Sequence, residues 1–158
     1  MFLKRLFIFS ALLLLSVPFN FLAQTINPVK WEFSYKETDD KNGEVILKAK
    51  LDPDWHFYSQ LQSGDGPLPT VFKFVKTPDY DLNGTVAEPD PERVHDVTFD
   101  ADVAMFIREA TFTQKVKRNT KKDFVIMGEV EIMLCNNVMC LPPKTYKFTL
   151  KIPQNELK

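Results

Sequence analysis

The stretch Val29-Lys30-Trp31-Glu32-Phe33-Ser34-Tyr35-Lys36 alternates apolar and polar side chains at every step. A period of two is typical of a β-strand that buries one face. The same alternation recurs at residues 45–51 and 146–152. Between the first two segments lie residues 39–43, an Asp-Asp-Lys-Asn-Gly run that favours a turn because Asn and Gly tolerate positive φ. The pattern therefore predicts a fold of antiparallel strands.

The rest of the chain adds shorter strand candidates, which lie at residues 55–58, 71–75, 111–116 and 124–134. Residues 77–92 hold three prolines and Gly84, so we expect an irregular connection there. Residues 94–106 have no clear period, and residues 101–106 are a candidate for a short helix. Residues 117–122 are basic and polar, which suits a solvated hairpin tip. About seven or eight short strands without a long helix predict an all-β, antiparallel β-sandwich.

Composition restricts the class of protein further. The 158 residues include 20 Lys and Arg, 21 Asp and Glu, and 44% hydrophobic residues. This balance indicates one globular domain. The net charge of −1 gives no electrostatic reason to expect nucleic-acid binding. Because the chain has two cysteines and two histidines, it cannot build a four-thiolate zinc site. We expect no metal and no cofactor.

The N-terminal segment resembles a secretory signal in its layout. Lys4 and Arg5 precede an apolar run at residues 6–17, and the small residue Ala23 follows. This arrangement predicts a signal peptide over residues 1–23. Cleavage after Ala23 would leave a domain of residues 24–158 outside the cytoplasm, where a disulfide persists.

An uncleaved membrane anchor is the alternative for this segment, because Phe19, Phe21 and Leu22 lengthen the apolar run. After cleavage we expect no stable membrane insertion. The apolar run of residues 6–17 alone is short for a span, which needs about 20 residues.

The two cysteines lie in Glu129-Val-Glu-Ile-Met-Leu-Cys135-Asn-Asn-Val-Met-Cys140-Leu-Pro142-Pro143-Lys144. Cys135 shares strand parity with the two glutamates, which predicts that it starts on the solvent side. An Asn-Asn pair suited to a turn precedes Cys140, so the two thiols could close a small disulfide. Pro142 and Pro143 stiffen the exit and withhold two backbone donors.

Two roles remain open for such a bridge. Closing so short a loop stabilises a fold by about 2 kcal/mol, less than a longer loop would give. A sandwich of this length has core enough without it. The residues alone leave an exchanging disulfide and a structural staple as equal alternatives.

Other chemistries have weaker support. The soft ligands Met133, Cys135, Met139 and Cys140 would suit Cu(I), but methionines at such positions usually serve packing. We expect His56 and His95 to be surface or half-buried side chains. The five glycines form neither a dinucleotide-binding nor a serine-hydrolase motif.

The cysteine and double-proline element resembles the active-site stretch of the periplasmic N-terminal domain of DsbD, a transmembrane thiol–disulfide reductase. Residues 55–60, Trp-His-Phe-Tyr-Ser-Gln, are similar to that family's aromatic strand, and residues 66–74 to its next loop and strand. The resemblance covers nearly all of the chain after residue 23. It implies an immunoglobulin-like antiparallel β-sandwich.

The same resemblance implies roles for individual residues. Cys140 takes the place of the exposed, attacking cysteine, and Cys135 that of its resolving partner. Phe99 stands where the family has an aromatic residue on a cap loop over the disulfide, and Tyr58 matches an aromatic residue beside it. The spacing is one residue shorter than in the best-known members.

The implied function is periplasmic thiol–disulfide interchange, in which a protein-disulfide reductase component passes two electrons between protein partners. The implied partners are thioredoxin-like or disulfide-isomerase-like proteins. The resemblance is to the N-terminal domain of DsbD and not to its membrane domain or its C-terminal thioredoxin-like domain. We therefore expect that a separately encoded membrane reductase donates the electrons or that the fold is kept for another task. The alternative is a non-catalytic β-sandwich that binds a partner and uses its disulfide only as a staple.

Overall fold

The computed structural model describes residues 26–61, 66–96 and 99–154. The predicted signal peptide, residues 1–23, lies outside these residues. The described part forms eleven strands: β1 (Val29–Glu37), β2 (Asn42–Leu51), β3 (His56–Tyr58), β4 (Val71–Phe74), β5 (Tyr80–Ala87), β6 (Glu92–Asp96), β7 (Ala101–Ile107), β8 (Glu109–Arg118), β9 (Phe124–Ile132), β10 (Leu134–Cys135) and β11 (Lys144–Ile152). All of their pairings are antiparallel. The all-β prediction is confirmed.

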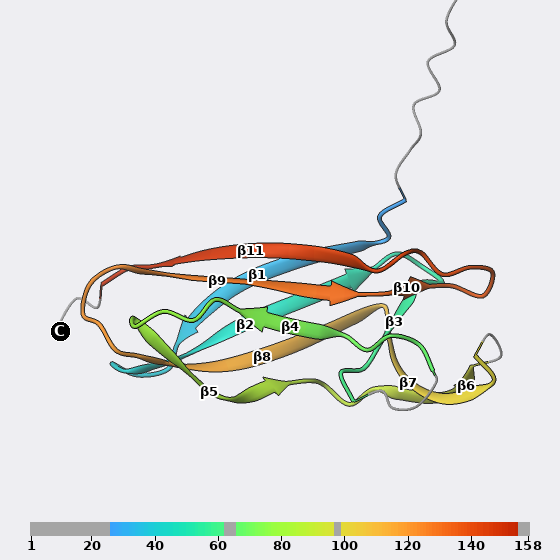
Figure 1. Cartoon of the computed structure of the whole chain (residues 1–158), viewed down its shortest axis with the longest axis horizontal. Helices are drawn as coiled ribbons and strands as arrows, with labels where there is room; N and C mark the ends of the chain where they lie inside the picture. The colour runs from blue at the N-terminus through green and yellow to red at the C-terminus, as the bar shows by residue number, and fades with distance from the viewer. Residues whose placement is uncertain (1–25, 62–65, 97–98, 155–158) are drawn as a thin grey trace, which may run out of the picture.

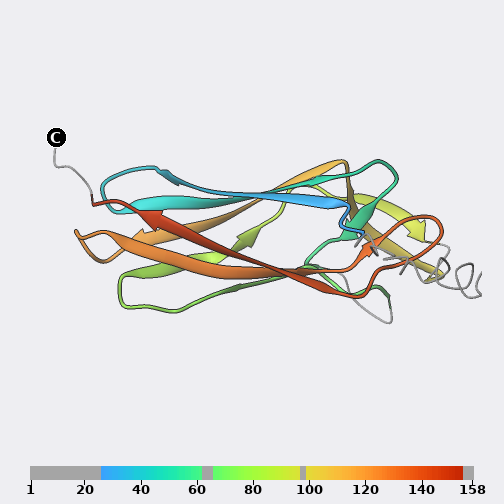
Figure 2. The same ribbon diagram turned by 90° about the horizontal axis from the view of Figure 1, so that it is seen from above.

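Two sheets form the body of a sandwich (Figures 1 and 2). One has the strand order β1-β2-β8-β5 and the other β11-β9-β4. The apolar face of β1 places Phe33 against Phe148 of β11, with ring centroids 4.8 Å apart. Phe72 of β4 meets Phe112 of β8 at 4.9 Å. These rings interdigitate between the sheets and exclude water, which is the main apolar stabilisation of the sandwich.

A third sheet, β10-β3-β7-β6, lies at one end of the sandwich (Figure 1). A single residue, Arg108, separates β7 from β8, and its φ of 63° breaks the strand between the two sheets. One face of the third sheet carries Phe57, Phe106 and Leu134, which belong to the main core. The other face of the third sheet does not contribute to the main core, and its side chains form a second, separate apolar cluster.

Two expectations from the sequence are wrong in this region and beside it. The candidate helix at residues 101–106 lies within strand β7. The connection expected at residues 77–92 contains strand β5, most of whose residues are exposed. Neither segment shows the alternation of apolar and polar residues that is typical of a strand, because neither has one buried and one exposed face.

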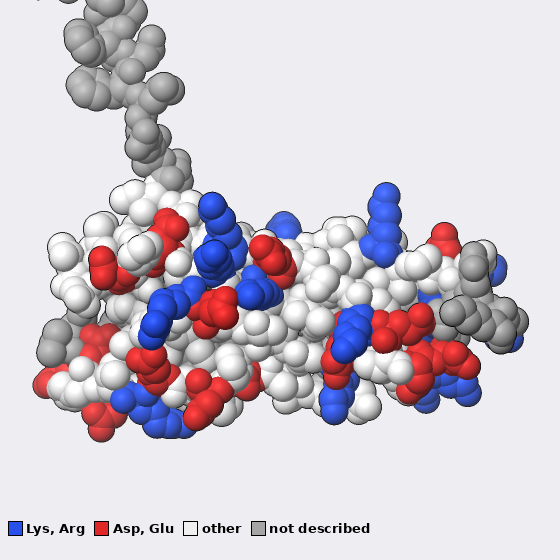
Figure 3. Space-filling model, turned by 180° about the vertical axis from the view of Figure 1, so that it is seen from behind, with Lys and Arg blue, Asp and Glu red and all other residues white. Residues whose placement is uncertain are grey.

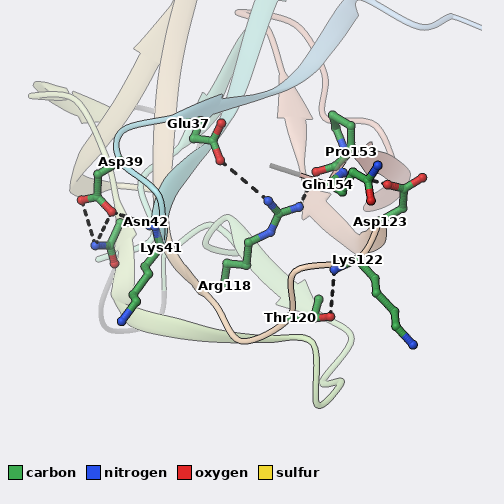
Figure 4. Close-up of polar contacts among 10 residues, drawn as sticks. All are labelled: Glu37, Asp39, Lys41, Asn42, Arg118, Thr120, Lys122, Asp123, Pro153 and Gln154. Carbon is green, nitrogen blue, oxygen red and sulfur yellow. Dashed lines mark hydrogen bonds and ion pairs between the residues drawn. The ribbon is translucent and has the colours of Figure 1, made fainter. Parts of the chain in front are cut away.

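The end opposite the third sheet is held by polar contacts (Figure 4). Arg118, at the end of β8, lies 3.8 Å from the Glu37 carboxylate, donates to the Pro153 carbonyl and covers the Phe124 ring. The basic turn at residues 117–122 is thus not a hairpin tip, although most of its residues are exposed as expected. It carries the chain from one sheet to the other, and Arg118 is buried.

Charges on the surface are mixed. On the face seen in Figure 3, Lys and Arg side chains are intermixed with Asp and Glu, and uncharged surface separates the charged groups. Within residues 26–61, 66–96 and 99–154, no helix is long and apolar enough to span a membrane.

Candidate redox site around Cys135 and Cys140

The two cysteines form a disulfide that closes one short loop. Strand β10 ends at Cys135, and Cys140 returns opposite it as an isolated antiparallel bridge with Cα atoms 4.0 Å apart. Asn136 shapes the turn because its side-chain oxygen accepts the amides of Val138 and Met139, each at 2.9 Å. The Leu141 amide then donates to the Leu134 carbonyl at 2.8 Å, which closes the hairpin. The predicted turn chemistry is present.

The two cysteines differ in exposure. Cys135 is 1% exposed, whereas Cys140 is half-buried. The expectation that Cys135 starts on the solvent side is wrong. Strand β9 ends at Ile132, and β10 begins at Leu134 in a different sheet, so the parity of the glutamate run does not continue through Met133.

Cys135 is buried in a second apolar cluster, separate from the sandwich core. Its fully buried members are Tyr58, Val103 and Cys135, and around them pack Val94, Phe99, Ala101, Met105, Met133 and Cys140. These side chains lie over the outer face of the third sheet. The disulfide is therefore part of a small core of its own at the end of the molecule.

Phe99 and Tyr58 both belong to this second cluster. Their rings meet edge to face, with centroids 6.0 Å apart. Phe99 follows β6 and precedes β7, at the tip of the hairpin that these strands form. Val97 and Thr98, in the same predicted cap stretch, lie outside the described residues. Phe106, the other aromatic of that segment, belongs to the main core.

A chain of polar groups runs through the second cluster. The Tyr58 hydroxyl donates to Asp96 Oδ2 at 2.9 Å, and His56 Nε2 lies 3.1 Å from the same hydroxyl. His56 is buried, so its expected placement at or near the surface is wrong. Burial lowers the pKa of His56, and the charge of Asp96 partly opposes that shift. His95 is exposed and lies 3.3 Å from Asp100 and 3.2 Å from Asp102.

Sequence reasoning did not single out His56 or Asp96 as site residues. One feature of the sequence could have indicated His56. The predicted strand at residues 55–58 places His56 and Tyr58 on the same face, because side chains alternate along a strand. Its partner strands were not predicted, so nothing in the sequence brought Asp96 to that face.

Apolar side chains surround the disulfide on the surface. Val138 is 90% exposed and Met139 46% exposed at the tip of the loop. Pro142 and Pro143 are also exposed and line an apolar groove that Ile26, Leu141 and Tyr146 continue. The face that carries Cys140 is thus rich in unburied apolar surface.

The described ranges contain no group of three or more His, Cys, Asp and Glu side chains that could hold a metal ion. The four soft ligands considered for Cu(I) are used otherwise. The two sulfurs of the cysteines are bonded to each other, Met133 packs in the second cluster and Met139 is exposed.

The fold and the site define a class of domain, an antiparallel β-sandwich with a disulfide confined to one loop at its end. The chain belongs to the family described as thiol:disulfide interchange protein DsbD, N-terminal, whose model matches residues 23–152. The resemblance drawn from the cysteine and double-proline element is thereby confirmed. No curated protein sequence matches the chain.

Solved structures share the fold. The N-terminal domain of DsbD from Neisseria meningitidis in the reduced form is 16% identical with a TM-score of 0.52, over 78% of this chain and 86% of that one. In its complex with the PilB N-terminal domain, the DsbD N-terminal domain from the same organism gives 15% identity and a TM-score of 0.54, over 80% of this chain and 87% of the other.

The N-terminal periplasmic domain of ScsB from Proteus mirabilis is 14% identical with a TM-score of 0.56. The match covers 81% of this chain but 47% of the ScsB chain, so our chain spans about half of that structure. With these neighbours, the sandwich is of the immunoglobulin-like type that the resemblance implied.

Proposed function

We propose that this protein is a periplasmic thiol–disulfide interchange domain that passes two electrons between protein partners through Cys135 and Cys140. The observation that carries the proposal is the asymmetry of the bridge: one cysteine is buried and the other half-buried in a loop lined by exposed apolar side chains. A partner thiolate can approach Cys140, while Cys135 is held beside it. Exchange therefore begins at Cys140, and Cys135 resolves the mixed disulfide.

The partners are proposed to be thioredoxin-like or disulfide-isomerase-like proteins, with a separately encoded membrane reductase as electron donor. Membership of the family supports this proposal. So does the solved complex in which a DsbD N-terminal domain binds the PilB N-terminal domain. We further propose that residues 1–23 are a cleaved signal peptide and residues 24–158 the working domain, because the segment has a basic start, a short apolar run and a small residue at the cut. The similarity to the N-terminal periplasmic domain of ScsB supports a periplasmic location.

Trapping tests the assigned roles. In Cys135→Ser, Cys140 has no resolving partner, so mixed disulfides through Cys140 should accumulate with periplasmic redox proteins. The matched control is Cys140→Ser, in which the remaining thiol is buried and should trap far less. Equal trapping by both variants, or trapping only by Cys140→Ser, would overturn the assignment.

A redox titration separates exchange from a staple. An exchanging pair should have a reduction potential near thioredoxin-like values, about −270 mV, whereas a structural bridge lies below about −300 mV. Equilibration in dithiothreitol buffers, read by alkylation of the free thiols, gives the potential directly. A value well below the second limit would favour the non-catalytic binding module.

A further inference from the structure

The hydrogen-bonded line of His56, Tyr58 and Asp96 has no role in the cysteine chemistry described so far. It lies in the second cluster, beside the buried sulfur. In the register of β10 and β3, Cys135 pairs directly with His56. Residues opposite each other on antiparallel strands have Cβ atoms about 4.5–5.5 Å apart and point to the same face. His56 is therefore the ionisable neighbour of Cys135 across the sheet.

The direction of the hydrogen bonds fixes the state of the histidine ring. Tyr58 has one hydroxyl proton, and it donates that proton to the Asp96 carboxylate. Its oxygen must then accept from His56 Nε2, which lies 3.1 Å away. The proton of neutral His56 is thus on Nε2, and the lone pair is on Nδ1. Nδ1 of His56 forms no hydrogen bond with any of the described residues.

The surroundings keep this arrangement in place. Burial lowers the pKa of His56, so the ring is neutral at pH 7 and can accept a proton. Burial and the bond to Asp96 raise the pKa of Tyr58, so the phenol keeps its proton. On β7, the residues paired with His56 and Tyr58 are Ile107 and Met105, neither of which titrates.

Among the described residues, strand β6 contributes two carboxylates to this face of the third sheet. Asp96 pairs with Ala101, and Glu92 of the same strand pairs with Met105, at the other end of β6. Asp96 is the charged group whose field acts on His56. A protonated ring would be stabilised by that carboxylate through the Tyr58 hydroxyl, as an oriented base is by its third group.

The chemistry of resolution needs such a base. After Cys140 has formed a mixed disulfide, Cys135 must lose its thiol proton before its sulfur can attack. A buried thiolate loses the hydration that stabilises its charge, so unaided ionisation of Cys135 is costly. A neutral imidazole on the paired strand lowers that cost, because it accepts the proton beside the developing thiolate and the Asp96 carboxylate stabilises the charged ring.

We propose that His56 is the general base for Cys135, oriented by Tyr58 and Asp96; this inference rests on the proposed interchange function. The Cys135 proton moves to His56 Nδ1, and the Cys135 sulfur attacks Cys140 Sγ. The Cys135–Cys140 bond forms while the bond from Cys140 to the partner sulfur breaks, and the partner leaves as a thiolate. The cysteine pair loses two electrons and the partner disulfide gains them.

The test follows both steps of one turnover with the aromatic disulfide dithiobis(nitrobenzoate). The reduced protein releases one coloured thiolate when Cys140 attacks the reagent and a second when Cys135 resolves the adduct. In His56→Gln, whose amide still donates to Tyr58 but takes no proton, the first release should be unchanged. The second should slow about 10- to 100-fold at pH 7, at the lower end of base catalysis because thiols also ionise unaided.

The pH profile distinguishes a base from a structural residue. The second release of His56→Gln should approach the wild-type rate at high pH, where Cys135 ionises without help. Tyr58→Phe keeps the base but removes its link to Asp96, so its defect should be smaller and of the same pH dependence. The matched control is His95→Gln, the other histidine of the same sheet, which should leave both releases unchanged.

Three outcomes decide the matter. A second release in His56→Gln within threefold of wild type at pH 7 overturns the base role. An equal slowing at every pH assigns His56 to packing and also overturns it. If the wild-type protein itself never gives a second release, the proposed interchange function fails, independently of His56. Should His56→Gln not fold, Tyr58→Phe alone decides, since its slowing must diminish as the pH rises.

Discussion

Strand β3 contributes side chains to both apolar clusters of this protein, and the two clusters differ in composition. Phe57 points into the sandwich core, where it meets Phe106 and Phe112. Its neighbours His56 and Tyr58 point the other way, into the cluster that contains the disulfide. The large cluster is built of rings and aliphatic chains that join two sheets. The small one mixes rings with sulfur and a line of hydrogen bonds, so stability and chemistry are on opposite faces of one strand.

A substitution in the large cluster should have the largest effect and tests whether the two clusters are independent. Phe112 is completely buried and contacts rings from both sheets. Phe112→Ala should lower the free energy of unfolding by about 3–5 kcal/mol, through lost burial and the cavity left behind. Urea denaturation of the oxidised protein measures the loss. Below the transition, alkylation of the reduced cysteines should proceed as in wild type, and a large acceleration would show that the clusters are not independent.

Reduction of the disulfide should have the next largest effect. The bridge closes a loop of short sequence separation, so its loss should lower the free energy of unfolding by about 2 kcal/mol. Urea transitions with and without dithiothreitol give the difference, and the double variant Cys135→Ser, Cys140→Ser should be indifferent to the reductant. A reduced chain that no longer folds would mean that the small cluster supports the whole sandwich.

A pair of phenylalanines on one hairpin separates covering from packing. Phe99 belongs to the small cluster and Phe106 to the large one. If Phe99 covers the cysteines, as the cap role proposes, Phe99→Ala should speed alkylation of the reduced cysteines several-fold and should lower the free energy of unfolding by about 1 kcal/mol or less. Phe106→Ala should show the reverse, a large loss of stability with unchanged alkylation. If Phe99→Ala lost several degrees of melting temperature without faster alkylation, the cap role would be wrong.

The smallest effect belongs to the turn at the far end of the molecule. Hydrogen bonds from the Asn42 side chain and the amides of Lys41 and Asn42 lower the pKa of Asp39 (Figure 4). A lowered carboxyl pKa stabilises the fold above the ordinary value of about 4 and ceases to do so as the pH falls through the lowered one.

Asp39→Ala should therefore be slightly less stable than wild type at neutral pH and equal to it in strong acid. Thermal unfolding across that range measures the difference. Thiol reactivity should not change, since this turn is at the end opposite the disulfide. A deficit that persists unchanged in acid would assign the effect to something other than the carboxylate.

Much of the sandwich was predictable because each of its long strands has one solvent-exposed face and one buried face. The segments that begin at Val29, Asn42 and Lys144 all carry that period and are strands β1, β2 and β11. The sequence pattern does not predict strand β7, because Val103 faces the small cluster while Phe106 faces the main core. Two buried faces erase the alternation on which the prediction depends.

The sequence predicts the two cysteines of the site but not the residues that surround them. Sequence spacing placed Cys135 and Cys140 in one loop, whereas the burial of Cys135 depends on β10 joining the third sheet. The same pairing brings His56 beside it. Contacts of this kind depend on tertiary packing, and no local pattern in the chain records them.

The short separation of the two cysteines also has a consequence for how the chain reaches its native state. Pairing of β2 with β8 must bring Asn42 to Lys117, a long search along the chain. Oxidation of Cys135 and Cys140 by an external oxidant that accepts their two electrons requires the chain to close only a small loop, and that closure is fast in an unfolded chain. With two cysteines in the sequence, no wrong partner competes. The bridge can therefore be acquired before the sheets assemble, and strand pairing, rather than disulfide rearrangement, should set the folding rate.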